Sequence, residues 1–460
     1  MPEPKQAYRD LESIFRAGVE RVDPRALISA GLHLEGTKLE LKSESVSLTL
    51  DLGQFERVLV LGAGKASAAM AAGLEQVLGD RINAGVVVVK YGHTEELKRI
   101  RLIEAGHPVP DEQGVLGAEA VEALARRADE KTLVVNLISG GGSAILPAPF
   151  QGSGASGPLA LSLEDKRAAT RVLLGCGATI QEFNCIRKHI SALKGGRLAE
   201  LLHPARSLNL ILSDVVGDRL DAIASGLTVA DETTFAQALA IVDKYAIEEK
   251  LPAAVMDLLR RGAAGEFPET PKPGDPVFAS VSNVLLGTNF TALSAAAAKA
   301  GELGYSPVVL SSRVVGEARE VARVLAAIAV DASSKALMTK KPACILCGGE
   351  TTVTLRGEGL GGRNQELALS FLQEIGAAGP AAVKGLYFLS AATDGNDGPT
   401  DAAGAFASAD ILERARQQQL SIPGCLARND SYHFYEAVGG LLKTGPTNTN
   451  VCDLQICLIY

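Results

Sequence analysis

Residues 57–67 read RVLVLGAGKAS, an apolar run that ends in two glycines, a lysine and a serine. The continuous aliphatic run at 58–61 predicts a strand buried on both faces of a parallel sheet. Gly62 and Gly64 allow a tight turn, and residues 66–74 predict the helix that follows. Such a turn aims unpaired N–H groups at an anion, and Lys65 adds a full positive charge. The stretch therefore predicts an anion-binding turn, with a plain βα turn and a solvated lysine as the alternative.

The turn matches neither of the two common phosphate-binding motifs. A dinucleotide fingerprint requires a third glycine where this chain has Ser67, and an acidic residue where the next predicted strand ends in Lys90. A Walker A loop requires glycine at the position of Leu59. The motif alone does not choose between an anion site and a structural turn.

Composition narrows the class of protein. The chain has 460 residues, 47% of them hydrophobic, which is enough for two or three domains. The net charge is -8 and no basic stripe occurs, which argues against a nucleic-acid partner. The start, MPEPKQAYRD, lacks an apolar signal core, and the apolar run at 321–330 is short and contains Arg323, so we expect no membrane segment. Seven scattered cysteines fit a reduced, cytoplasmic protein.

The order of elements predicts an α/β fold with two domains. Strands alternate with helices as in a Rossmann-like parallel sheet. We expect a Rossmann-like N-terminal domain at 1–265, a linker at 266–279 and a distinct C-terminal α/β domain at 280–460. We expect a helix at 5–22 to pack on the first domain. We expect a mobile loop at 151–160. Cys344 and Cys347 should lie in the core. The main predicted strands are 85–90, 100–105, 132–138, 207–212, 281–286, 307–310, 343–347, 352–355, 386–391 and 454–458; the main predicted helices are 114–127, 179–193, 289–303 and 316–336.

Three predicted strands of the first domain end in small and polar residues, at 62–67, 139–143 and 213–218. Carboxyl ends of parallel strands face one crevice, where ligands bind. The SGGGS turn can offer backbone amides to a phosphate or carboxylate. The candidate binding residues here are Gly62, Gly64, Ser67, Ser139, Gly140, Gly141, Gly142 and Ser143, with Arg187, Lys188 and Lys194 from a polar helix that could also be merely solvated.

The second domain supplies a further set of polar residues. Arg363 in GGRNQE is placed to reach an anion, and the turn at 393–398 with Asp401 crowds carboxylates that could bind Mg2+ or form an ordinary Asp/Gly turn. The isolated histidines, including His107 and His189, favour packing or capping over catalysis. The further candidates for substrate or nucleotide binding are Glu350, Thr351, Asn364, Gln365 and Asn429.

The serial motifs resemble those of the glycerate 2-kinases, some of which are labelled hydroxypyruvate reductases. They include LISGGGSAILPAP, NCIRKHISALKGGRLA, LILSDVVGD, GGETTVTL, GGRNQELAL, ATDGNDGPTDAAGA and LARNDSYHF, in family order from about residue 10 to 455. The resemblance implies ATP-dependent phosphorylation of D-glycerate at the 2-hydroxyl, a divalent metal, and an active site in the cleft between the two domains. Lys65 and Arg363 match the family's lysine and arginine thought to act in catalysis.

On this hypothesis Lys65 and Arg363 neutralise the transferring phosphoryl group. Asp214 or Asp394 binds Mg2+ or accepts the hydroxyl proton, and Asp397 is a third candidate metal ligand. The partners are D-glycerate and ATP, and a homodimer is the default assembly. An NAD(P)H-dependent hydroxypyruvate reductase and a non-catalytic ligand sensor remain the rival hypotheses.

Overall fold

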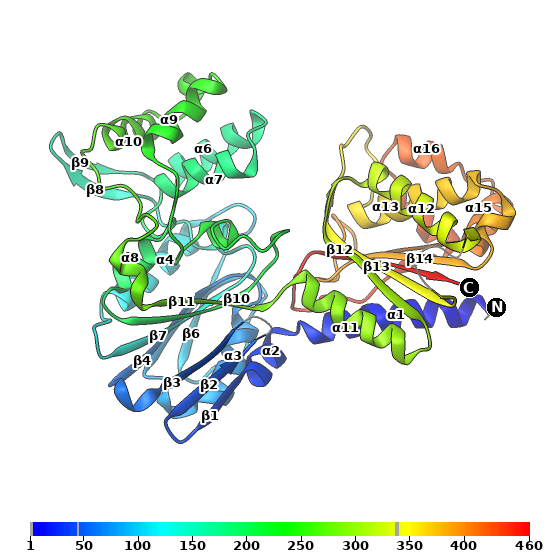
Figure 1. Ribbon diagram of the computed structural model, residues 1–460. Coiled ribbons are helices and arrows are strands. Elements are labelled where there is room, and N and C mark those ends of the chain that lie inside the picture. Colours follow the sequence, from blue (N-terminus) through cyan, green and yellow to red (C-terminus); the bar gives the residue numbers. More distant parts are fainter. Residues whose placement is uncertain (1–2, 44–45, 336–339) are drawn as a thin grey trace. The chain divides into compact units, whose positions relative to one another are not determined.

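The computed structural model of the protein describes residues 3–43, 46–335 and 340–460 (Figure 1). The chain forms two compact units. One, the Rossmann-like unit, consists of Pro24–Ser213 and Asp218–Leu286. The other, the C-terminal unit, consists of the residues up to Asp23, the short segment Asp214–Gly217 and Gly287–Tyr460. Two of the predicted domain assignments differ from this division.

The first difference is the N-terminal helix α1 (Pro4–Arg21), which we expected on the first domain. It packs instead in the C-terminal unit, against α11 (Asn289–Glu302) and β17 (Asp453–Ile459). Its apolar stripe, including Leu11 and Phe15, is buried there. Beyond its end, Thr449 Oγ1 donates a hydrogen bond to the backbone oxygen of Val22 at 2.6 Å. An amphipathic pattern predicts a buried face but not the element that covers it.

The second difference concerns the predicted linker at 266–279, which is a packed part of the Rossmann-like unit. Phe267 is buried and meets Phe150 edge to face, with ring centroids 5.2 Å apart. Thr270 Oγ1 donates to the carboxylate of Asp231 at 3.0 Å. The proline and glycine content of this segment suits an irregular backbone, and the buried side chains fix it in place.

The Rossmann-like unit is built on a six-stranded sheet in the order β11-β10-β7-β4-β5-β6. β10, β7, β4, β5 and β6 pair in parallel, as the sequence predicts. From β4 the chain crosses through α3 to one side, and from β6 through α4 to the other, so right-handed crossovers place these helices on opposite faces (Figure 1). The elements are β4 (Arg57–Ala63), α3 (Ser67–Leu78), β5 (Ala84–Lys90), β6 (Ile100–Ala105), α4 (Glu112–Ala125), β7 (Thr132–Ile138), α5 (Gly142–Ile145), α8 (Arg197–Leu202), β10 (Arg206–Leu212) and β11 (Val281–Gly287).

Two smaller layers complete this unit. An antiparallel sheet with α2 precedes β4: α2 (Pro24–Gly31), β1 (Leu32–Glu35), β2 (Lys38–Lys42) and β3 (Ser47–Asp51). A helical subdomain with its own apolar core lies above the main sheet in Figure 1: β8 (Gln151–Gly154), β9 (Gly157–Ala160), α6 (Leu163–Gly175), α7 (Ile180–His189), α9 (Phe235–Lys244) and α10 (Ala253–Ala263). We predicted a loop at 151–160, and the predicted secondary structure was wrong, because β8 and β9 pair there as an antiparallel hairpin.

The C-terminal unit contains a mixed six-stranded sheet in the order β12-β13-β17-β14-β15-β16. α12 and α13 contact one another and the sheet, and α1 contacts α11, so the sheet has helices on both faces (Figure 1). Cys344 and Cys347 lie buried in β13, as predicted. A separate strand at 352–355 is not formed. The elements are β12 (Ser306–Glu317), α12 (Ala318–Lys335), β13 (Ala343–Thr352), α13 (Arg363–Ala377), α14 (Pro380–Val383), β14 (Leu386–Ala392), β15 (Gly404–Ser408), α15 (Ala409–Gln417), α16 (Ile422–Ala427), α17 (Ser431–Val438) and β16 (Leu441–Leu442).

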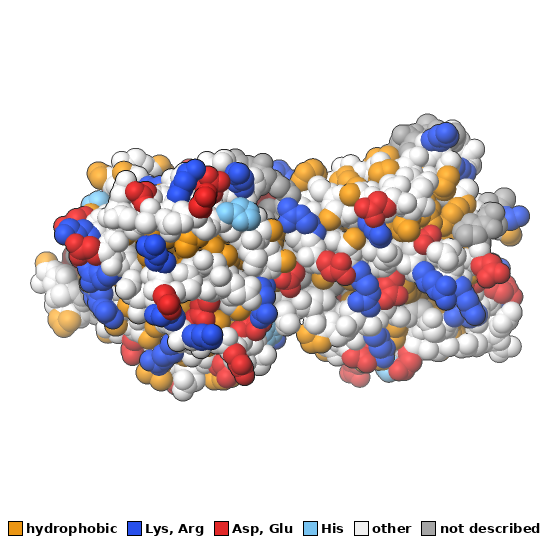
Figure 2. Space-filling view, turned by 90° about the horizontal axis from the view of Figure 1, so that it is seen from below, with side chains coloured by type: hydrophobic (Ala, Val, Ile, Leu, Met, Phe, Trp, Pro, Cys, Tyr) orange, Lys and Arg blue, Asp and Glu red, His pale blue; other side chains and the backbone are white. Residues whose placement is uncertain are grey.

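Charged side chains of both signs are interspersed on the face shown in Figure 2. None of the helices in the described part of the chain combines the length and the apolar character needed to cross a lipid bilayer.

Candidate functional site

The turns after β4 and β7 are locked together by hydrogen bonds. Lys65 N–H donates to the backbone oxygen of Gly140 at 2.9 Å, and Ala66 N–H donates to Ser139 Oγ at 3.0 Å. The hydroxyls of Ser67 and Ser139 are 3.0 Å apart and hydrogen-bonded. Both serines are fully buried. They were predicted as ligand-binding residues, and the structure shows them joining the two turns.

The second turn leaves several backbone donors without a protein partner. Within the described residues, the N–H groups of Gly140, Gly141 and Ser143 have no hydrogen-bond acceptor. Gly141 has φ 80°, a conformation that favours glycine. Successive unpaired amides in such a turn form a concavity suited to an anion. We call Gly140, Gly141, Ser143 and Lys65 the glycine-loop cluster.

Basic groups surround this turn. A Cβ atom added at Gly141 would lie 3.2 Å from Lys65 Cγ and 3.0 Å from His107 Cδ2, so both side chains lie against the turn. Burial lowers the pKa of His107 to about 4, helped by the positive charges of Lys65, Lys90 and His93. His107 is therefore neutral at pH 7 in a positively charged setting. No local pattern pointed to His107 as a neighbour of the glycine loop, because it follows β6 and not β4 or β7.

Gly64→Ala is expected to be strongly destabilising. Gly64 has φ 143°, and a Cβ there would lie 2.1 Å from Ser139 Oγ and 2.5 Å from the Ser139 backbone oxygen. Gly157→Ala is the matched control, because Gly157 has φ 103° with no heavy atom within 4 Å of its Cβ. We expect Gly157→Ala to lower the free energy of unfolding by about 1–2 kcal/mol, from backbone strain alone. Gly64→Ala should lower it by about 1–3 kcal/mol more, because of the steric clash. Urea unfolding of both variants measures this difference in stability. Equal losses in the two variants would contradict the expected clash at Gly64.

The three predicted cations of α7 and the following turn have different surroundings. Lys188 Nζ lies 3.2 Å from Asp231 and 3.6 Å from Asp221, so its charge is already compensated. Arg187 Nη1 donates to Ser143 Oγ at 3.1 Å and therefore reaches the glycine loop. Lys194 is fully buried. Only the last two remain candidates for an external anion.

In the C-terminal unit, Arg363 stands at the start of α13 and is held by two carboxylates. Its Nε and Nη2 donate to Asp453 at 2.6 and 2.8 Å, and its Nη1 lies 3.0 Å from Glu350. Burial opposes the charged guanidinium, but the two bonds to Asp453 prevail, and the pKa of Arg363 is raised. We call Arg363, Asp453 and Glu350 the Arg363 cluster. Asp453 was missed; its signal was a single acid in the apolar strand VCDLQICLI.

Two predicted carboxylates lie near this cluster. The Sγ of Cys452 donates to the backbone oxygen of Asp214 at 3.1 Å. Burial raises the pKa of Cys452, and the charges of Glu350, Asp214 and Asp453 contribute to the rise. Asp394 lies in the turn after β14, where its Oδ1 accepts from Asn396 N–H at 3.0 Å.

Asp397, which we predicted as a metal ligand, accepts two backbone hydrogen bonds in this structure. Its two oxygens accept from the backbone N–H groups of Asn364 and Gln365 at 3.0 and 2.8 Å, which caps α13. Burial raises the pKa of Asp397 to about 6, against the lowering effect of these two bonds. Both oxygens are engaged, so the structure gives Asp397 a helix-capping role. No group of three or more His, Cys, Asp or Glu side chains among the described residues is placed to hold a metal ion.

The remaining predicted binding residues of this unit are largely internal. Asn429 donates to Glu366 at 2.9 Å and accepts from Arg356 N–H at 2.7 Å. Asn364 accepts from Ser390 Oγ at 2.6 Å. Thr351 Oγ1 and Gln365 Oε1 are buried and have no partner within the described part of the chain.

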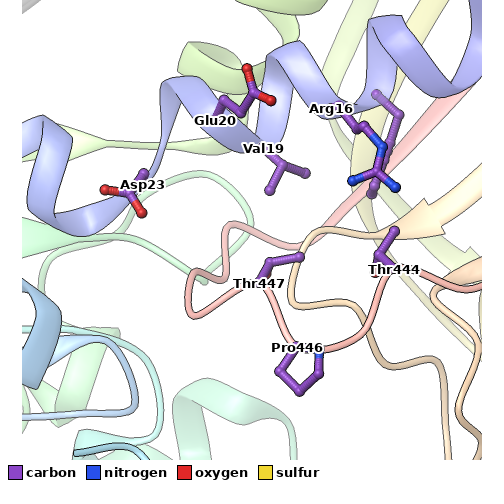
Figure 3. A pocket seen from close by; sticks show the side chains of 8 residues that line it. Arg16, Val19, Glu20, Asp23, Thr444, Pro446 and Thr447 are labelled. Carbon is purple, nitrogen blue, oxygen red and sulfur yellow. The ribbon is translucent and has the colours of Figure 1, made fainter. Parts of the chain in front are cut away.

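A separate cavity of about 350 Å³ lies in the C-terminal unit, between the end of α1 and the segment 444–447 (Figure 3). Arg16, Glu20 and Asp23 line it on the helix side, and Thr444 and Thr447 on the other. It contains no predicted site residue. Thr447 nevertheless connects it to the turn after β14, because its N–H donates to the backbone oxygen of Asp394 at 3.2 Å.

Comparison with known proteins decides the family. Residues 10–260 match the model of a domain of unknown function, DUF4147, and residues 343–453 match the MOFRL family. The chain is 41% identical to a glycerate 2-kinase of Pyrococcus horikoshii, over 88% of this chain and 87% of that protein. The chain belongs to the glycerate 2-kinase family. The crystal structure of a glycerate kinase of Thermotoga maritima matches it with a TM-score of 0.85 and 37% identity, over 99% of this chain and 100% of that one.

A relative in Agrobacterium vitis with the provisional name hydroxypyruvate reductase is 45% identical, over 88% of this chain and 99% of that protein. Both names occur among the relatives of this glycerate 2-kinase family member, as the resemblance implied. Membership of the family and the α/β fold with a Rossmann-like part are confirmed.

Proposed function

We propose that this chain transfers a phosphoryl group from ATP to the 2-hydroxyl of D-glycerate, giving 2-phosphoglycerate and ADP. The observation that carries the proposal is the glycine-loop cluster. It combines three backbone donors that lack an acceptor with Lys65, which has no carboxylate partner in the described chain. Phosphoryl transfer asks a protein mainly for positioned donors and positive charge.

The proposed roles follow from these surroundings. Lys65 and the amides of Gly140, Gly141 and Ser143 bind phosphate or carboxylate oxygens. Arg363 supplies a second positive charge, and Asp453 fixes the plane of its guanidinium. Asp214 or Asp394 accepts the proton of the attacking hydroxyl.

Mg2+ is part of the proposal. Mg2+ is commonly held by one or two carboxylates together with phosphate oxygens and water, so a cage of three side chains is not required. Asp214 and Asp394 fit that role, whereas both oxygens of Asp397 already cap α13. When bound, the ion would neutralise charge on the nucleotide phosphates.

A reductase using NAD(P)H is the second candidate, since one relative carries that provisional name. Two residues disfavour it. Ser67 is buried and hydrogen-bonded where the dinucleotide motif needs its third glycine. β5 ends in Lys90, where an acidic residue would bind the ribose of NAD.

The test is a pair of assays on the full chain. D-glycerate with Mg-ATP should give ADP and a product whose phosphorus NMR signal couples to the proton on C2. Hydroxypyruvate with NAD(P)H should give no oxidation of the cofactor. A product with phosphate on C3, or turnover only in the second assay, would contradict the proposal. We further propose a cytoplasmic enzyme, which the seven free cysteines support, and a homodimer, the commonest assembly.

A further inference from the structure

Three basic side chains converge on residues 143–148, the segment that follows the glycine loop. Lys166 comes from α6, Arg187 from α7 and Lys194 from the turn after α7. Lys166 Nζ donates to the backbone oxygen of Pro147 and to that of Ala148, the latter at 3.4 Å. Lys194 Nζ donates to the backbone oxygen of Leu146 at 2.5 Å. Arg187 Nη1 donates to Ser143 Oγ at 3.1 Å. Lys166 was not among the predicted site residues.

These three basic side chains have no acidic partner among the described residues. Lys166 is 6% exposed and Lys194 0%, and neither they nor Arg187 form an ion pair with any described residue. The charges that act on Lys166 are all positive and belong to Lys194, Arg187 and Arg197. The nearby Lys188 is the opposite case, because it pairs with the buried Asp231. A buried charge without a partner is costly unless a ligand compensates it.

The backbone beside these cations is strained. Ala148, Ala224 and Ser225 have φ values of 38°, 49° and 58°, in the left-handed region that non-glycine residues seldom adopt. Ser225 Oγ is hydrogen-bonded to Ser143 Oγ at 2.8 Å, which joins the strained segment to the glycine loop. Strain of this kind persists where surrounding contacts enforce it, commonly at functional sites.

We propose that Lys166, with Lys194, is a positioning residue of a receptor for an oxyanion. The two ammonium groups hold residues 146–148, and their charge, with that of Arg187, attracts the anion to the glycine loop. This proposal rests on the proposed function for the identity of the anion. Under that function, the anionic group belongs either to the nucleotide phosphates or to the carboxylate of glycerate.

The receptor should take up protons when it binds an anion. Burial, and to a smaller extent the positive charge of Arg187, lower the pKa of Lys194 to about 7. Burial also lowers the pKa of Lys166, as do the charges of Lys194, Arg187 and Arg197. A bound anion raises both values, so the protonated form binds more tightly. The affinity for the anion should therefore be highest below pH 7, and it should fall as the pH rises through the pKa of Lys194 in the free protein.

The experiment uses the full chain and sulfate, which is doubly charged across the whole pH range used. Sulfate affinity is measured by titration calorimetry for the parent and for Lys166→Met, with Lys250→Met as the matched control on an exposed lysine of the same helical subdomain. We expect Lys166→Met to weaken sulfate binding at least about 10-fold, and to leave the melting temperature without ligand equal to or above that of the parent. Lys250→Met should bind like the parent.

If Lys166 is purely structural, Lys166→Met will have a lower melting temperature than the parent and a sulfate affinity within twofold of the parent. That result would overturn the proposal. If Lys166→Met does not fold, the parent decides: its sulfate affinity should fall at least about 10-fold from pH 6.5 to 9.5, and an unchanged affinity overturns the proposal. A non-hydrolysable ATP analogue and D-glycerate, each competing with sulfate, identify the source of the anion. Sulfate binding that depends on Lys166 in a chain without kinase activity would refute the proposed function and leave the receptor standing.

Discussion

Arg363→Met is expected to lower kcat for glycerate phosphorylation by about 1,000-fold, the scale of an arginine that stabilises a transferring phosphoryl group. The same change should destabilise the protein by about 3–5 kcal/mol, because it leaves the fully buried Asp453 without its partner. Steady-state kinetics and urea unfolding measure the two effects separately.

The double variant Arg363→Met with Asp453→Asn separates catalysis from stability. Replacing Asp453 by asparagine removes the buried charge, so the double variant should regain most of the lost stability. It should regain none of the activity. If Arg363→Met alone keeps kcat within a few-fold of the parent, Arg363 is only the structural partner of Asp453, and the proposed role in phosphoryl transfer is lost.

Lys65→Met is expected to give the other pattern, a large kinetic loss without a stability loss. We expect kcat to fall at least about 100-fold, and the free energy of unfolding to change by less than about 0.5 kcal/mol. The reason is that Lys65 has no ion-pair partner among the described residues, and its backbone N–H bond to Gly140 does not depend on the side chain.

Lys131→Met is the control for Lys65. Lys131 precedes β7 at the opposite end of the same sheet, is exposed, and pairs with Glu56 at 2.6 Å. Its replacement should leave kcat unchanged, and Lys65→Arg should restore part of the activity lost in Lys65→Met. Activity near the parental value in Lys65→Met would contradict the assignment of Lys65 to the reaction.

Local patterns predicted most of the Rossmann-like sheet. The predicted strands at 100–105 and 132–138 coincide with β6 and β7. β7 is buried along its whole length and is therefore mostly apolar, whereas β6 is an edge strand that alternates buried and more exposed residues. The three polar strand ends do follow neighbouring strands, since β10, β7 and β4 are adjacent. The hydrogen bonds of Ser139 to the turn after β4 could not be predicted, because they join residues more than 70 positions apart.

What the sequence did not predict depends on contacts between distant segments. Asp453 meets Arg363 across 90 residues, and Asp397 caps a helix that begins 34 residues earlier. Lys166 looked like an ordinary lysine on a helix with a capping box, and only tertiary packing buries it. In each case residue type and spacing were compatible with an exposed side chain, and burial changed its chemistry.

The position of α1 in the C-terminal unit has a consequence for synthesis on the ribosome. α1 (Pro4–Arg21) is translated long before β17 (Asp453–Ile459), the strand it packs against. The Rossmann-like unit can complete its sheet before β17 is translated, whereas the apolar stripe of α1 is covered only after β17 has been made. A nascent chain stalled before residue 453 should therefore expose that stripe to chaperones.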